Sequence, residues 1–215
     1  MIKLYFDIET VPADDSEMDV FFDILKKKNG NKDKTDLMLH EETTFEGTFG
    51  RICCIGVIKE GHDGKILLKE VFSGDEKDQL KKFWDAAANV HRFIGHNIWS
   101  FDLPYIYKRS IIKGVKPRMD ISFARYRNIP IYDTMCEWDL WNFGKAQKLD
   151  TLAKVLGLPT SKDEMDGSEV WQYFKDGRID EICRYCMKDV ELTRNVYKKM
   201  TFEEDENESR SDIPF

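Results

Sequence analysis

The segment KLYFDIE, residues 3–9, constrains the fold most, because it has the composition of a buried strand and yet carries two acids. Its residues are mostly apolar and alternate poorly, a pattern that predicts a central strand ending near Glu9. Asp7 and Glu9 are two residues apart, so on a strand both side chains leave the same face. Unpaired charges in an apolar strand cost free energy. The pair is therefore either solvated at the strand end, as D-x-E pairs often are, or a rigid base for a metal site.

The other hydrophobic patterns predict an α/β domain with a mixed sheet. RICCIGVIKE and ILLKEVF are apolar runs separated by the turn GHDGK, which predicts a β-hairpin. Residues 73–90 open with Ser and an acidic first turn and place Leu80, Phe83 and Trp84 at helical spacing, which predicts an amphipathic helix. Further strands are expected at 91–97 and 129–134, and further helices at about 16–28, 101–113, 134–143, 148–156 and 178–199. This order predicts a central sheet whose first three strands are antiparallel, flanked by helices.

The length of 215 residues suits one sizeable core. We expect a single domain over residues 1–200. Residues 13–48 are polar and charge-rich, and we expect them to be a helix followed by a mobile excursion, inserted between the first two strands. Residues 201–215 are expected to be an acidic disordered tail ending in DIPF.

A third acid lies in the segment GHNIWSFDLPYI, where a strand is expected to lead into a helix. Asp102 could cap that helix, a role that Asp often has. Alternatively, Asn97 and Asp102 at such a junction would suit a phosphate or metal-water site.

A fourth acid lies on the last predicted helix, in RYCMKDVELTRNVY. Tyr185 and Asp189 are four residues apart, so they share one helix face. The same face continues through Leu192 and Val196, which makes it inward-pointing. An inward Asp needs a partner, and a metal shared with the acids of the first strand would supply one.

The four carboxylates, Asp7, Glu9, Asp102 and Asp189, have no histidine or thiol among them. Such oxygen donors favour hard cations, so we expect Mg²⁺ or Mn²⁺ rather than zinc. Two such ions about 3.5–4 Å apart can clamp the attacking and leaving oxygens of a phosphodiester displacement. Tyr185 is a poor general base at neutral pH, since an unperturbed tyrosine has a pKa near 10. Its expected role is to orient the attacking water.

The cysteines and the hydropathy exclude several classes of protein. The cysteine count is odd, and two neighbours lie in an apolar strand, which favours free buried thiols over a disulfide framework. The pair Cys183 and Cys186 has no second pair to complete a zinc site. No stretch reaches the roughly 18 apolar residues of a membrane span, and the N-terminus does not resemble a secretion signal. We therefore expect a cytoplasmic protein that does not contact membranes.

Three segments, in order, resemble the motifs of the DEDD exonucleases. D-I-E at 7–9 resembles the first motif, H-N-x-x-x-F-D at 96–102 the second and Y-x-x-x-D at 185–189 the third. The tyrosine is typical of the DEDDy branch, which includes the proofreading domains of family-B and Klenow-type DNA polymerases and RNase D. DIET, HNxxxFDLP, YCxxDVxLT and LDTLAKVLGLP at 149–159 are most similar to the family-B version. The resemblance runs from residue 1 to about 200, although residues 13–48 match nothing in it.

That resemblance implies an RNase H-like fold, two divalent metals and release of nucleoside monophosphates from a 3′ end. It implies a free-standing exonuclease acting on DNA. The second alternative is an exoribonuclease of the same chemistry, since the DEDDy branch includes RNA trimmers. A non-catalytic adaptor that retains the fold is the third alternative. Residues in and beside the first two motifs are expected to contact the substrate: Thr10, His96, Asn97, Trp99 and Phe101.

Seven basic residues and one acid lie between residues 108 and 127, with aromatic residues among them. This composition suits a groove that follows a single strand and stacks bases on rings. A solvated helix face and loop is an equally good explanation.

The formal charge of −7 is concentrated near the C-terminus. Residues 203–212 hold six acids and one Arg, which leaves only −2 for the rest of the chain. The ending resembles the C-terminal tail of bacterial single-stranded-DNA-binding proteins, whose tip docks on repair and replication enzymes. That resemblance implies that Ile213, Pro214 and Phe215 bind a partner protein; a frayed acidic tail that lies in a basic groove or aids solubility is the alternative.

Overall fold

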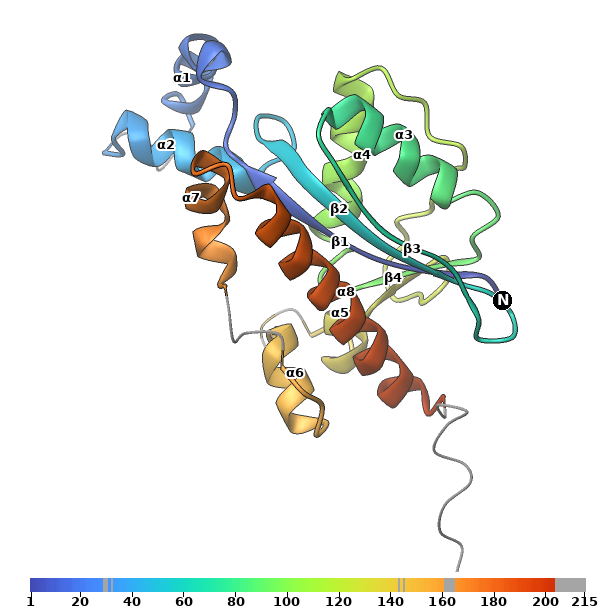
Figure 1. Cartoon of the computed structure of the whole chain (residues 1–215). Helices are drawn as coiled ribbons and strands as arrows, with labels where there is room; N and C mark the ends of the chain where they lie inside the picture. The colour runs from blue at the N-terminus through green and yellow to red at the C-terminus, as the bar shows by residue number, and fades with distance from the viewer. Residues whose placement is uncertain (29–30, 32, 143, 145, 161–164, 204–215) are drawn as a thin grey trace, which may run out of the picture.

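The computed structural model describes every residue except 29–30, 32, 143, 145, 161–164 and 204–215. Its strands form one mixed sheet in the order β3-β2-β1-β4-β5, in which β1, β2 and β3 are antiparallel neighbours and β4 and β5 run parallel to β1 (Figure 1). The strands are β1 (Lys3–Val11), β2 (Arg51–Glu60), β3 (Ile66–Ser73), β4 (Arg92–Gly95) and β5 (Ile131–Asp133). The predicted mixed sheet with three antiparallel strands is confirmed.

Eight α-helices surround the sheet in the described part of the chain. They are α1 (Met18–Leu25), α2 (Asp36–Glu42), α3 (Glu76–Ala86), α4 (Asp102–Ile112), α5 (Thr134–Trp138), α6 (Leu149–Val155), α7 (Val170–Lys175) and α8 (Ile179–Thr201). Short 3₁₀ turns precede α1, follow α2 and precede α7, at Asp15–Glu17, Thr43–Phe45 and Gly167–Glu169. Helices α3 and α4 cover one face of the sheet, and the long α8 crosses the other (Figure 1).

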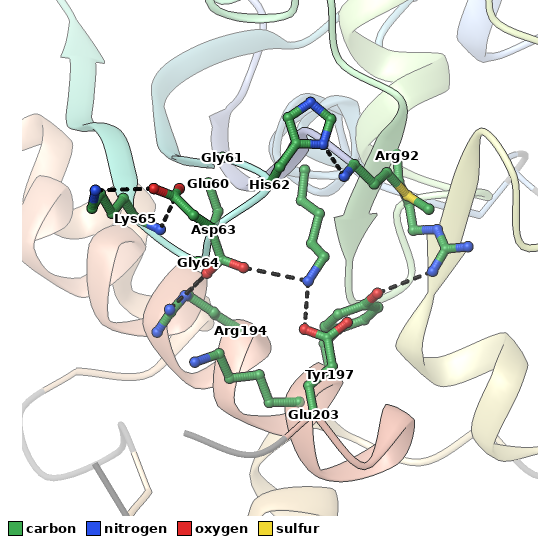
Figure 2. A pocket seen from close by; sticks show the side chains of 13 residues that line it. Glu60, Gly61, His62, Asp63, Gly64, Lys65, Arg92, Arg194, Tyr197 and Glu203 are labelled. Carbon is green, nitrogen blue, oxygen red and sulfur yellow. Dashed lines mark hydrogen bonds and ion pairs between the residues drawn. The ribbon is translucent and has the colours of Figure 1, made fainter. Parts of the chain in front are cut away.

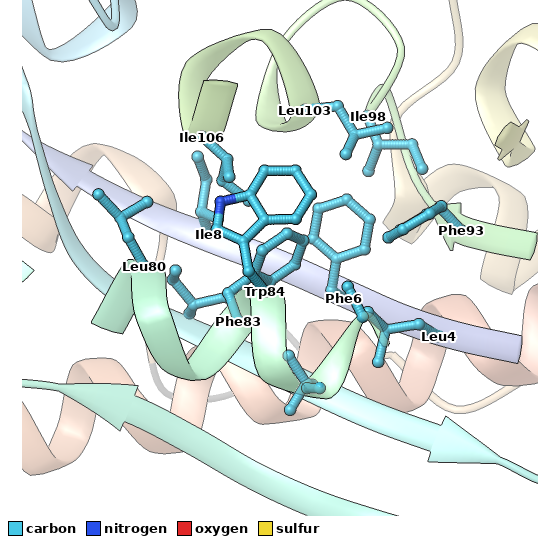
Figure 3. Packing of buried hydrophobic residues seen from close by; sticks show 14 of the residues in the cluster. Leu4, Phe6, Ile8, Leu80, Phe83, Trp84, Phe93, Ile98, Leu103 and Ile106 are labelled. Atoms are coloured by element: carbon cyan, nitrogen blue, oxygen red, sulfur yellow. The ribbon is translucent and has the colours of Figure 1, made fainter. Parts of the chain in front are cut away.

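Strand β1 explains why the sheet has two different faces. Leu4, Phe6 and Ile8 point to the α3 and α4 side, where they join the main hydrophobic cluster with Phe83 and Trp84 (Figure 3). The alternate residues point to the α8 side, because successive side chains of a strand leave opposite faces. On that side Tyr5 and Val11 pack in clusters that contain α8 residues. Burial on both faces accounts for the nearly continuous apolar composition of β1.

Two helix boundaries expected from the sequence are corrected. The helix expected at 16–28 is shorter, Met18–Leu25, and the helix expected at 134–143 ends at Trp138. There Leu140 and Trp141 have positive φ angles of 49° and 61°, which an α-helix cannot continue through. Helices α2 and α7 were not predicted.

The inserted segment is not merely an excursion. Its described residues fold over a small hydrophobic cluster that includes Ala13, Met18, Leu25, Leu39 and Phe49. The insertion therefore packs as a small unit beside the end of β1.

The cysteine prediction is confirmed. All five cysteines lie in the described part of the chain and are free thiols, of which four are buried and Cys183 is half-buried. Among the described helices, none combines the length and apolar character that crossing a membrane requires.

Candidate metal centre

The first two acids leave β1 on the face that α8 covers. Asp7 pairs across the sheet with Gly56, and Glu9 pairs with Cys54, both on β2. The register shifts between Glu9 and Thr10, so a β-bulge follows the second acid directly. Glu9 is 9% exposed and Asp7 is half-buried. The strand thus holds both carboxylates side by side, as the sequence predicted, and beneath a helix.

Asp102 contacts the same strand along the backbone edge that faces β4. β4 pairs with β1 only from Lys3 to Tyr5, so the backbone of β1 beyond that point lacks a strand partner on this edge. The amide of Ile8 donates to Asp102 Oδ1 at 3.1 Å and thereby replaces a ladder hydrogen bond. Phe101, not Asp102, is the N-cap of α4, and Asp102 is the first helical residue. The alternative that Asp102 serves as a helix cap is therefore wrong.

Helix α8 carries the last pair over Asp7 and Glu9. Tyr185 and Asp189 are both half-buried, and a hydrogen bond joins their side chains. Asp189 interacts electrostatically with Asp7 and with Glu9. The helix packs on β1 and β2, which brings a residue from the end of the chain next to residues from its beginning.

The acids repel one another, and this shows in their protonation. Burial raises the pKa of Asp7 well above its ordinary value, and neighbouring acids, including Asp102, Glu9 and Asp189, raise it further. Burial, and then Asp189, likewise raise the pKa of Glu9. Burial raises the pKa of Asp102 to about 7, although the hydrogen bond from Ile8 opposes the rise.

Asp7, Glu9 and Asp102 form no ion pair with a lysine or arginine among the described residues. Burial of carboxylates without a cation is costly, so a bound cation would stabilise this arrangement. Oxygen donors of this kind fit a hard divalent ion. The residues present thus fit the predicted metal site.

A thiol lies beside these carboxylates, which the sequence analysis did not anticipate. Cys186 is fully buried on α8, and its Sγ lies 3.7 Å from Asp7 Oδ2. One ligand atom from each of Asp7, Glu9 and Cys186 lies within 4.8 Å of the others. The spacing of Cys186 and Asp189, three residues apart on one helix face, is the sequence signal that could have revealed it.

Four of the five residues predicted to contact substrate lie in the segment between β4 and α4: His96, Asn97, Trp99 and Phe101. The Asp133 carboxylate accepts hydrogen bonds from the amides of Asn97 and Trp99, at 2.9 and 2.8 Å, and from two amides at the start of α5. Asp133 is therefore a structural acid that holds this segment. Asn97 has a φ of 65° and accepts a hydrogen bond from the Ser100 hydroxyl.

The other members of this predicted set already have partners within the chain. His96 Nδ1 contacts the Thr134 hydroxyl and its Nε2 the carbonyl of Gln147, both at 2.9 Å. Burial lowers the pKa of His96, so its imidazole is neutral near pH 7. The Trp99 indole donates to the Phe123 carbonyl at 3.3 Å. These contacts favour a supporting role for His96 and Trp99 over direct contact with a ligand.

Two further predicted contacts lie on either side of the acids. Thr10 is buried, immediately after the shift in register between β1 and β2. Phe101 is half-buried, and its ring lies 5.5 Å from that of Tyr105. Neither position excludes contact with a ligand at the carboxylates, and both assignments stay predictions.

The basic residues between 108 and 127 are only partly available for a ligand. Arg109 is 3% exposed and forms two hydrogen bonds of 2.8 Å with Glu76. Lys113 pairs with the same Glu76, and Arg118 pairs with Asp85. The explanation that these cations belong to the helix packing and the solvated surface thus holds for three of the seven.

A pocket of about 780 Å³ lies elsewhere, at the end of the sheet where the central strand β1 begins (Figure 2). Its charges are largely neutralised by each other: Glu60 pairs with Lys3 and with Arg194, and Lys3 also pairs with Glu203. Asp7 and Glu9 lie four and six residues after Lys3 on β1, which is about 13–20 Å from Lys3 at the usual rise of a strand. The size of this pocket does not identify the site, because Asp7 and Glu9 do not line it.

The last three predicted residues, Ile213, Pro214 and Phe215, lie outside the described residues.

Comparison with known proteins gives one family. The family described as "Predicted 3'-5' exonuclease related to the exonuclease domain of PolB" matches residues 43–211, more than three quarters of the chain. The match includes Asp102, Tyr185 and Asp189, whereas Asp7 and Glu9 precede it. No curated protein matches.

A solved structure extends the likeness to the N-terminal strand. The family B DNA polymerase of the hyperthermophilic archaeon Pyrobaculum calidifontis is similar over 94% of this chain, with a TM-score of 0.60 and 20% sequence identity. The similar region spans 24% of that polymerase. At this identity the likeness concerns the fold, and it is consistent with the predicted RNase H-like architecture.

Proposed function

The chain belongs to the family of predicted 3′-5′ exonucleases related to the exonuclease domain of PolB, and we propose that it hydrolyses DNA from the 3′ end in a divalent-metal-dependent reaction. The products would be nucleoside 5′-monophosphates, and the preferred substrate single-stranded DNA in repair or replication. The observation that carries the proposal is the meeting of acids from β1, α4 and α8 with no cation paired to Asp7, Glu9 or Asp102 among the described residues. The likeness to a DNA polymerase supports DNA as the substrate.

Asp7, Glu9, Asp102 and Asp189 would hold the metal ions. Two Mg²⁺ or Mn²⁺ ions would activate the attacking water and stabilise the negative charge that develops on the leaving 3′-oxygen. Asp7 and Glu9 lie on a central strand, which fixes their separation. Asp102 is fixed by its hydrogen bond to Ile8, so the carboxylates are ordered by packing before a ligand arrives.

Tyr185 would orient the attacking water. Burial and then Asp189 raise the pKa of its phenol, so the group stays protonated at neutral pH and cannot serve as the general base. Its hydroxyl already bonds to Asp189, one of the proposed metal ligands. A water held by this hydroxyl would lie next to the metal ligands, which is the position an in-line attack requires.

Asn97 and Phe101, which lie on the turn between β4 and α4, and Thr10 would contact the last nucleotides of the strand. The backbone of this turn is held by Asp133. His96 would act indirectly, by holding the turn against α5 through Thr134.

The test uses 5′-labelled DNA and RNA oligonucleotides of one sequence, incubated with Mg²⁺ or Mn²⁺. Wild type should shorten DNA from the 3′ end, and Asp7→Ala should be slower by about a thousandfold, because a lost metal ligand removes several kcal/mol of transition-state stabilisation. Asp63→Ala, in the exposed turn between β2 and β3, is the control and should match wild type.

Three outcomes separate the alternatives. Shortening of RNA alone would make the chain an exoribonuclease of the same chemistry. Equal degradation by wild type and Asp7→Ala would remove Asp7 from the site. No degradation of either substrate by wild type would favour an adaptor that retains the fold.

A further inference from the structure

Cys186 is held against a proposed metal ligand. Its Sγ lies 3.5 Å from the backbone oxygen of Asp7 and 3.7 Å from Asp7 Oδ2. Gly56, opposite Asp7 on β2, leaves the space for this contact, since a Cβ at Gly56 would lie 2.9 Å from the sulfur. The thiol is fully buried, so its position is fixed by the packing of α8 on the sheet.

The separation of sulfur and oxygen matches that of two ligands of one ion. A tetrahedral zinc ion lies about 2.3 Å from a thiolate sulfur and about 2.1 Å from a carboxylate oxygen, which puts those two atoms about 3.6 Å apart. The observed separation between Cys186 Sγ and Asp7 Oδ2 is 3.7 Å.

Glu9 completes a group of three. One ligand atom from each of the three residues lies within 4.8 Å of the other two. Even at that limit each atom would lie about 2.8 Å from the centre of the triangle, so shifts of less than about 1 Å would bring all three into bonding distance. No other group of three histidine, cysteine or acidic residues this close occurs in the described part of the chain.

We propose that Cys186, Asp7 and Glu9 form a mixed sulfur and oxygen site for thiophilic divalent ions such as Zn²⁺, Cd²⁺ and Co²⁺. Thiolate sulfur prefers these ions, whereas Mg²⁺ prefers oxygen and would leave the thiol protonated. Binding of the thiophilic ion replaces the thiol proton, which passes to solvent.

This site overlaps the proposed catalytic one, because Asp7 and Glu9 belong to both. A thiophilic ion bound there would therefore compete with Mg²⁺. The inference rests on the proposed function only for this competition; the binding of the thiophilic ion stands without it.

The test is spectroscopic and uses the full chain. Co²⁺ bound by a thiolate gives an intense sulfur-to-metal charge-transfer band in the near ultraviolet, whereas Co²⁺ bound by oxygen alone does not. We expect wild type to show this band on titration with Co²⁺. Cys186→Ser should lack it while calorimetry still detects Co²⁺ binding to the carboxylates. Cys183→Ser, three residues earlier on the same helix, is the matched control and should keep the band.

Calorimetry with Zn²⁺ and Mg²⁺ gives a second readout. Cys186→Ser should weaken Zn²⁺ binding by about tenfold or more and change Mg²⁺ binding by less than about twofold. Wild type that binds Co²⁺ without the band, or a band that persists in Cys186→Ser, would overturn the proposal.

The two proposals fail separately. A chain that shows the Cys186-dependent band but degrades no nucleic acid would retain the thiophilic site and lose the proposed function. A chain that degrades DNA but never shows the band would retain the proposed function and lose the thiophilic site. The Co²⁺ measurements on wild type and Cys183→Ser do not need Cys186→Ser, so absence of the band from either protein would still overturn the proposal if Cys186→Ser does not fold.

Discussion

At the scale of single residues, Asp102 links the metal centre to stability. Its pKa in the folded chain is about 7, compared with an ordinary value of 3.8. Between about pH 4 and about pH 7, Asp102 keeps its proton in the folded chain and releases it in the unfolded chain. Folding therefore becomes less favourable as the pH rises from about 4 to about 7, and the cost is fully present above pH 7.

Asp102→Asn should therefore stabilise the metal-free protein. The amide oxygen of asparagine can still accept from Ile8, but the side chain carries no charge. We expect a gain at pH 8 of at most about 4 kcal/mol in the free energy of unfolding, and no gain below about pH 4. Urea unfolding in the presence of a chelator, at several pH values, measures it. Asp63→Asn, at an exposed turn, should show no gain at any pH, and a gain for Asp102→Asn that is equal at pH 4 and pH 8 would contradict the explanation.

Tyr185 can be tested without removing a ligand. Tyr185→Phe deletes the hydroxyl that bonds to Asp189 and keeps the ring. We expect turnover to fall roughly tenfold to a hundredfold, as for a misplaced reactant, with Mg²⁺ affinity unchanged. The pH dependence of the remaining activity should keep its shape, because the phenol does not titrate near neutral pH. Unchanged turnover would remove Tyr185 from the reaction, and a changed pH profile would make it an acid or base.

The sequence predicted the four acids but not the thiol beside them, for a physical reason. Asp7 and Glu9 interrupt an apolar strand, and Asp189 interrupts an inward helix face. Burying a charge without a partner costs free energy, so acids at such positions can be recognised from the sequence as candidates for a site. Cys186 shares the helix face of Asp189, but a buried cysteine is an ordinary apolar core residue, so its spacing alone did not distinguish it from the core. Only the packing of α8 on β1 shows that its sulfur faces Asp7.

At the scale of elements, the buried pair of Glu76 and Arg109 joins α3 to α4. Glu76 accepts from Arg109 twice, at 2.8 Å, and from the amide of Ile52 on β2 at 2.9 Å. The pair thereby fixes α4, whose first residue is Asp102, against the sheet. Its role is to position the helix that carries one of the proposed metal ligands.

Arg109→Ala should therefore destabilise the chain strongly. It would leave Glu76 as a buried carboxylate without its main partner, which costs about 3–5 kcal/mol. Arg118→Ala is the matched control, since its pair with Asp85 is exposed and should be worth less than about 1 kcal/mol. Urea unfolding compares the two variants, and equal losses would show that burial does not decide the strength of the Arg109 pair.

Most of the elements that the sequence predicted have a long or strongly apolar pattern, such as β1, β2, α4 and α8. The shorter helices α1 and α5 were also predicted, but with bounds that extend too far. The short helices α2 and α7 have seven and six residues, and helices of this length form because of packing rather than propensity. The capping box of Asp166 and Glu169 just before α7 was the available local signal.

At the scale of the whole molecule, the centre depends on residues from nearly the whole length of the chain. Asp7 and Asp189 meet although 181 residues separate them in the sequence. The family match begins at residue 43, so β1 is assigned to the site by its packing against α8 rather than by that match. A shortened chain can keep this centre only if it keeps β1 and α8 together, which places the earliest tolerable C-terminal truncation after α8.

We accordingly propose that residues 204–215 serve partner binding and not catalysis. They carry five acids and one Arg, whereas Glu203, which pairs with Lys3, would remain in a chain ending there. A chain ending at Glu203 should keep the melting temperature and exonuclease rate of the full chain, because all the proposed ligands are retained. It should lose binding to repair proteins that dock acidic tails, and a peptide of the last ten residues should bind those proteins less tightly as salt rises. Substituting Phe215 by Ala in the full chain tests the apolar tip apart from the charge. Retained partner binding by the truncated chain, or a peptide that shows no salt-sensitive binding, would leave the tail without this role.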